Sequence, residues 1–125
     1  MEKVIINGTT YVPETEAKAK AKAMAVTDGM EYVIVRTYSA GVHMGYLKNR
    51  EIGGKEVTLV NARRAWYWAG AFTLSAMAMN GVSKPSECKF STTVPEIILT
   101  EAIEIIPCTE KAKEILEGVS DHDPE

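Results

Sequence analysis

The sequence predicts an α+β fold: an antiparallel β-sheet meander with an N-terminal helix and short C-terminal helices, assembled into an oligomer. Residues 31–47 and 57–68 are rich in β-branched and aromatic residues, which pack well on a pleated sheet. The seven residues "REIGGKE" between them form a glycine-containing turn, which suits neighbouring antiparallel strands. Residues 14–26 and 110–117 are rich in strong helix formers. The chain of 125 residues is long enough for one core, so we expect a single domain over residues 1–120 and a disordered polar tail at 121–125.

The N-terminal region predicts a hairpin followed by a helix. In "KVIINGTTYV" apolar residues flank Asn7-Gly8, a dipeptide that tolerates the positive φ angles of a tight turn. Pro13 suits a first helical turn, and the alanine-rich run that follows predicts a helix over residues 14–26, closed by Asp28-Gly29. Its alternation of alanine and lysine also matches a strand, but both residues are poor strand formers. An alanine face buries little area, so this helix requires a partner surface and favours at least a symmetric dimer.

Residues 31–47 alternate with the period of a strand, and Gly41 and Gly45 predict a bulge, a bend or a close approach in its continuation. One predicted face carries Tyr32, Ile34, Arg36 and Tyr38, and the other carries Val33, Val35 and Thr37. The chain then returns through "VTLVNA" to complete three antiparallel strands. Together these patterns predict the meander at the centre of the fold.

The C-terminal half adds two helices and a second β region. A helix begins near Thr73 and stops at Gly81. Residues 92–107 predict a β region interrupted by Pro95, and Thr109 then caps a helix over residues 110–117 that ends at Gly118.

The stretch "VNARRAWYWAGAF" carries two arginines, then one alanine, then three aromatic residues. As a strand it places Arg64, Trp66 and Trp68 on one face and Asn61, Arg63 and Tyr67 on the other; as a helix it stacks Arg64 over Trp68. Such aromatic runs commonly form core or subunit interface. A guanidinium among them needs acids, carbonyls, a partner subunit or the phosphates of a ligand. Neighbouring strand residues favour the strand.

Other residues give little sign of catalysis, metal binding or a cofactor. His43 is a weak general-base candidate because no serine or cysteine nucleophile accompanies it, and Glu101 and Glu104 fall on opposite faces of a strand. Cys88 and Cys108 lack a CxxC spacing. We therefore predict no enzyme activity, no metal and no cofactor. The formal charge of -3 disfavours a nucleic-acid polymer, and no apolar run predicts a membrane span or a signal peptide, so we expect a cytoplasmic protein.

Four blocks of the sequence together resemble one family, the phage Thoeris anti-defence proteins of the first type. The blocks are "YVIVRTYSAGVHMGYL", "VTLVNARRAWYWAGA", "GVSKP" and "IIPCTEKAKE", in that order over residues 31–117. The resemblance implies a sponge, which binds the cyclic ADP-ribose isomers that bacterial TIR-domain proteins make and holds them without cleavage. It also implies a homo-oligomer, from a dimer to a hexamer, and capture of cyclic oligonucleotide signals at a separate site. A hydrolase of the same signal and a structural or protein-binding phage module are the alternatives.

A cyclic ADP-ribose isomer carries a flat base and a pyrophosphate, so a binding site for it needs stacking surfaces and anion donors. If the resemblance holds, Trp66, Trp68 and Phe72 supply stacking, Arg63 and Arg64 bind phosphate, and the helix N-terminus at Thr109 is a second anion donor. Asn61 completes the predicted set of ligand-binding residues.

Overall fold

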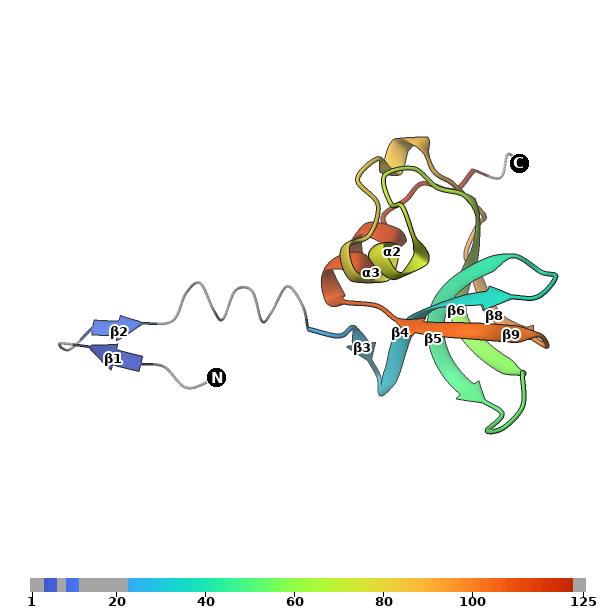
Figure 1. Ribbon diagram of the computed structural model, residues 1–125, viewed down its shortest axis with the longest axis horizontal. Helices are drawn as coiled ribbons and strands as arrows, with labels where there is room; N and C mark the ends of the chain where they lie inside the picture. The colour runs from blue at the N-terminus through green and yellow to red at the C-terminus, as the bar shows by residue number, and fades with distance from the viewer. Residues whose placement is uncertain (1–3, 7–8, 12–22, 123–125) are drawn as a thin grey trace.

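The computed structural model describes residues 4–6, 9–11 and 23–122, and its centre is the predicted three-stranded meander (Figure 1). Strands β4 (Met30–Thr37), β5 (Val42–Arg50) and β6 (Val57–Tyr67) pair antiparallel in chain order. The turn between β4 and β5 contains Gly41 at a φ of 83°, a left-handed conformation that glycine adopts without steric cost. The fold class is therefore confirmed for the sheet.

The second β region forms two strands on opposite edges of this sheet. Strand β8 (Val94–Leu99) pairs with β6, and β9 (Ala102–Pro107) pairs with β4. The predicted interruption at Pro95 is wrong: Pro95 lies within β8, and an edge strand tolerates a residue that cannot donate a hydrogen bond. The break comes instead at residues 100–101, between the two strands.

The short connection between β8 and β9 requires the sheet to curl. Three Cα steps from Leu99 to Ala102 span at most about 11 Å, whereas the outer strands of a flat five-stranded sheet lie about 19 Å apart. The edges must therefore approach each other at this end, which gives the sheet an inner and an outer face. Two small strands extend the edges: β3 (Val26–Thr27) pairs with β4, and β7 (Lys89–Phe90) pairs with β6.

Each face of the curled sheet has its own buried cluster. The inner cluster draws on three strands, β4, β6 and β8, and consists of Val33, Val35, Val57, Leu59, Ala62 and Leu99. The outer cluster joins Tyr32, Ile34 and Met44 to the helices α2 (Leu74–Asn80) and α3 (Glu110–Glu117). The predicted division of β4 into two faces is thus confirmed, and Figure 1 shows the two helices together on one side of the strands.

Both helices begin and end as the sequence predicts. The Thr73 hydroxyl accepts a hydrogen bond from Ala76 N at 3.0 Å, and α2 stops at Gly81, whose φ is 74°. Thr109 caps α3 in the same way, through Ala112 N at 3.1 Å, and Gly118 ends it. A 3-10 turn (Pro85–Glu87) lies in the loop that follows α2.

The N-terminal hairpin is confirmed by strands β1 (Val4–Ile6) and β2 (Thr9–Tyr11), which pair antiparallel. Most of the predicted helix over residues 14–26 lies outside the described residues. Its last four residues are not helical, and there the prediction is wrong: Met24 bridges to Thr109, and Ala25 N donates to Cys108 O at 2.9 Å. Ala25 is fully buried in the outer cluster, so tertiary packing overrides its helix propensity.

The predicted disordered tail is wrong for its first two residues. Asp121 forms an isolated bridge with Phe90 and an ion pair with Arg63, and His122 N donates to Phe90 O at 2.8 Å. These contacts fix the chain beyond α3 against the end of the sheet. Residues 123–125 lie outside the described residues.

Candidate functional site

A bulge in β6 decides how its two arginines are oriented. Tyr46 pairs with Val60 and Met44 pairs with Arg63, so β6 has one more residue than β5 over this interval. Asn61 takes up the excess in a left-handed conformation, with a φ of 50°. On the facing strand, a Cβ added at Gly45 would lie 3.0 Å from Ala62 Cα, a tight contact that glycine avoids, so glycine favours the close approach. The predicted bulge or close approach at Gly45 is confirmed, and simple alternation through Asn61 is wrong.

Arg63 points toward the outer cluster and is 4% exposed. Its Nε donates to Ser91 O at 3.1 Å, and its Nη1 donates to Leu116 O at 3.2 Å and Val119 O at 2.7 Å. Its Nη2 donates to the Asp121 carboxylate at 2.9 Å. Every nitrogen of this guanidinium has an intramolecular partner, so Arg63 fastens the C-terminal segment to the sheet.

Arg64 is exposed and has a different environment. Its Nε donates to Nε2 of His43, directly across the strand pair, at 3.2 Å. No carboxylate among the described residues forms an ion pair with Arg64, which leaves its two terminal nitrogens available to an anion. Arg64 is thus positioned by the hydrogen bond from Nε, and its two terminal guanidinium nitrogens can bind an anion.

His43 is a neutral partner for this arginine. It is 1% exposed, and burial together with the Arg64 charge lowers its pKa to about 4. Because Nε2 accepts from Arg64, the ring proton of the neutral imidazole is on Nδ1. That Nδ1 is buried with no hydrogen-bond partner among the described residues. An imidazole held neutral at physiological pH supports Arg64 without adding a second charge beside it.

A hollow of about 180 Å³ lies beside Arg64, at the margin of the inner cluster. Its lining is His43, Ala62, Arg63, Arg64, Ser91, Val94 and Ile97. Pockets that enclose a whole small-molecule ligand usually measure about 300 Å³ or more. The hollow can therefore accept only part of a nucleotide, with the remainder lying on the surface around it.

An aromatic and cationic cluster lies next to Arg64 along β6. A second register shift makes Trp66 and Tyr67 share one partner position, that of Lys89 on β7. The Lys89 ammonium lies 5.1 Å from the Trp66 ring centre and 5.7 Å from that of Tyr67. His122 meets Trp66 edge to face at 5.3 Å. Trp66 and Tyr67 remain about half exposed, so a flat ligand can reach both rings.

The other predicted ligand-binding residues lie elsewhere. Trp68 is half-buried against the outer cluster, and Phe72 is fully exposed in the loop before α2. Thr109 is 2% exposed, and its hydroxyl donates to Met79 O at 2.7 Å while it caps α3. Asn61 is exposed at the bulge. Arg64 and Trp66 of the predicted set lie two residues apart on β6 with exposed side chains; the structure adds His43 and Ser91 beside Arg64, and Tyr67 and Lys89 beside Trp66.

The two glutamates weighed as paired carboxylates and the two cysteines have structural contacts. Glu101 accepts from the Ser39 hydroxyl at 2.6 Å in the turn before β9, and Glu104 pairs with Arg36 at 3.3 Å. Both cysteines are buried, and burial raises the pKa of the Cys108 thiol to about 12. Within the described ranges, histidine, cysteine and acidic residues do not gather into a metal-binding group.

A curled antiparallel sheet with two helices on its outer face, carrying an arginine and aromatic residues on one strand, defines a small α+β domain with a candidate anion-binding surface. The chain belongs to the DUF6948 family, a domain of unknown function, which matches residues 30–116. No curated protein and no solved structure matches the chain. Over the described part of the chain, every helix is too short or too polar to span a membrane.

Proposed function

We propose that this domain is a sponge, which binds a cyclic ADP-ribose isomer at the exposed end of β6 and holds it without cleavage. The observation that carries the proposal is the Arg64 guanidinium, which has no acidic partner among the described residues and is held through Nε by a buried, neutral His43. We infer the ligand from the resemblance of the sequence to anti-defence sponges, and we infer the binding residues from the geometry of β6.

The chemistry of the β6 surface suits such a ligand. The free fork of Arg64 binds a pyrophosphate oxygen pair, and Lys89 adds a second positive charge. Trp66 and Tyr67 offer ring faces on which a purine stacks. Ser91 supports the strand itself, because its hydroxyl accepts from Arg64 N at 2.8 Å. Binding at this surface needs no reacting group, since a tight complex is sufficient to remove a signal from solution.

The proposal includes a homo-oligomer. A hollow of about 180 Å³ is too small to enclose a cyclic ADP-ribose isomer, so slow release requires a further surface over the ligand. A second copy of the chain provides it in a dimer or, as the resemblance implies, in a hexamer with a separate site for cyclic oligonucleotides. The setting we propose is the cytoplasm of an infected bacterium.

Calorimetric titration of the full chain with a cyclic ADP-ribose isomer tests the site. We expect saturable binding that Arg64→Gln weakens at least about tenfold, since a charge-assisted contact to phosphate contributes about 1.5–3 kcal/mol. Lys111→Gln is the matched control, because it removes one exposed positive charge from α3, on the outer face. Equal losses in the two variants would reduce the effect to net charge and contradict the site.

Recovery of the ligand tests the sponge against the hydrolase. Excess isomer is incubated with the protein, the mixture is boiled, and the supernatant is analysed by chromatography. A sponge returns the starting molecule in full. A linear ADP-ribose product that grows beyond one equivalent per site would establish a hydrolase and would make His43 and Glu101 candidates for the reacting groups. Failure to bind any nucleotide would favour a structural or protein-binding module.

A further inference from the structure

We propose that the C-terminal segment, residues 119–122, forms part of the nucleotide site, with His122 as the residue that positions the Trp66 ring for stacking. The inference rests on the proposed function and adds a residue to the same site. Two features of the segment carry it: Arg63, the neighbour of Arg64, fastens the segment to the sheet, and the His122 ring contacts the Trp66 ring.

The segment is held against the sheet through its backbone and through a side chain. Arg63, which is 4% exposed, donates to Val119 O at 2.7 Å and to the Asp121 carboxylate at 2.9 Å. Asp121 forms a parallel bridge with Phe90, and His122 N donates to Phe90 O at 2.8 Å. These contacts leave the backbone at His122 little freedom, so its side chain has a defined place beside β7.

The His122 ring lies against the Trp66 indole. The ring centres are 5.3 Å apart and the planes meet at 63°, which is typical of edge-to-face aromatic pairs. The Lys89 ammonium lies 5.1 Å from the centre of the same indole. Trp66 is 54% exposed, and an exposed side chain loses rotamer freedom when it stacks on a base. Because His122 and Lys89 hold the indole beforehand, less entropy is lost on binding.

The chain that follows β7 holds Arg64 in place independently of the His122 side chain. Ser91, directly after Phe90, donates from its backbone N to Arg64 O at 2.8 Å, and its hydroxyl accepts from Arg64 N at 2.8 Å. The contact with Trp66, in contrast, is made by the His122 ring itself. Loss of that ring should therefore weaken the stacking of a base and leave the binding of phosphate unchanged.

NMR of the isotopically labelled free chain tests whether His122 positions Trp66. In His122→Ala the Trp66 indole N–H should become more mobile, measured as a lower heteronuclear NOE, while that of Trp68, half-buried against the outer cluster, stays unchanged. Trp66→Phe assigns the signal, since the chain has two tryptophans. His122→Phe keeps an aromatic contact and should restore the wild-type value. An unchanged Trp66 signal in His122→Ala would overturn the positioning role.

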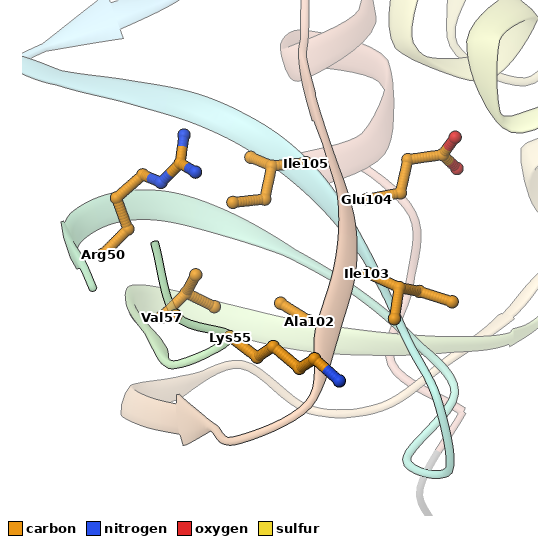
Figure 2. Close-up of a pocket in the computed structure, with 8 residues that line it drawn as sticks. Arg50, Lys55, Val57, Ala102, Ile103, Glu104 and Ile105 are labelled. Carbon is orange, nitrogen blue, oxygen red and sulfur yellow. The ribbon is translucent and has the colours of Figure 1, made fainter. Parts of the chain in front are cut away.

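Calorimetric titration then compares two probes, cyclic ADP-ribose and inorganic pyrophosphate. His122→Ala should weaken binding of cyclic ADP-ribose about threefold to tenfold, the effect of a lost edge-to-face pair. Its affinity for pyrophosphate should stay within about twofold of the wild type, as should both affinities of His122→Phe. Lys55→Gln is the control, because this exposed residue lies at the hollow beside β9 (Figure 2), whose lining includes neither Arg64 nor Trp66.

The outcomes separate this inference from the proposed function. Equal weakening of both probes in His122→Ala would indicate a general loosening of β6 and contradict the inference, and so would a failure of His122→Phe to restore binding. Normal binding of cyclic ADP-ribose by both the wild type and His122→Ala would overturn the inference alone. A wild type that binds no nucleotide would overturn the proposed function and, with it, this part of the site.

Discussion

Replacing either of the two adjacent arginines of β6 with methionine should have opposite effects. Arg63→Met should lower the free energy of unfolding more, and Arg64→Met should weaken nucleotide binding more. Arg63→Met keeps much of the apolar stem of the side chain but removes the donors to Ser91 O, Leu116 O, Val119 O and the Asp121 carboxylate. Buried acceptors left without a partner cost about 1–3 kcal/mol each, and relaxation with water entry recovers part of this. We therefore expect the free energy of unfolding to fall by about 3–5 kcal/mol, a large fraction of the 5–15 kcal/mol of a typical domain.

Arg64→Met is the matched control. It removes one hydrogen bond and leaves a single buried acceptor, Nε2 of His43, without that donor, so we expect a smaller loss of about 1–2 kcal/mol. Urea unfolding followed by tryptophan fluorescence measures both, and the midpoint should change with little change in slope. Nucleotide binding, measured per folded molecule, should be weakened more by Arg64→Met than by Arg63→Met. A loss below about 1 kcal/mol for Arg63→Met would refute the argument that its contacts fasten the C-terminal segment.

Three further predictions concern pH, packing and exposure. His43 has a folded pKa of about 4, below its unfolded value of 6.5, so its stabilising effect is complete above pH 6.5 and falls by up to about 3 kcal/mol as pH drops toward 4. Unfolding free energies measured across this window should show that slope, and His43→Asn should flatten it. Gly45→Ala should lower the free energy of unfolding by about 1–3 kcal/mol, because its Cβ would meet Ala62 Cα at 3.0 Å; an unchanged urea midpoint would contradict the close approach. Phe72→Ala should shift the thermal midpoint little, with a change within about 0.5 kcal/mol, since the ring is fully exposed; a larger loss would indicate a contact in the assembly.

The sequence was sufficient to predict the elements whose signals are local. Alternation over Tyr32–Val35 gave both faces of β4, and the caps at Thr73 and Thr109 gave the starts of both helices, because each depends on neighbouring residues alone. Ala25 shows the opposite case. Its helix propensity is local, but it is buried in the outer cluster and hydrogen-bonded to Cys108, far along the chain, and this packing decides its conformation.

The candidate site was predictable only in part. Arg64 and Trp66 are predictable from residue type. The different environments of Arg63 and Arg64 are not, because they depend on which residue of β6 is the extra one, and the pairing with β5 decides that. Gly45 marked the position on one strand and nothing local marked Asn61 on the other. From the sequence alone, His43 is only a weak general-base candidate. Its pairing with Arg64 follows from the strand register, which the sequence does not specify residue by residue.

The most direct test of the central claim is an NMR map of the complex between the labelled chain and a cyclic ADP-ribose isomer. The account predicts saturable shifts of the Arg64 Nε–H and the Trp66 indole N–H, together with a change at the His43 ring nitrogens. Resonances of Phe72 and Thr109 should stay in place, since neither residue lies beside Arg64. Tight binding with the Arg64 and Trp66 signals unmoved would contradict the site, and the absence of binding would contradict the proposed function.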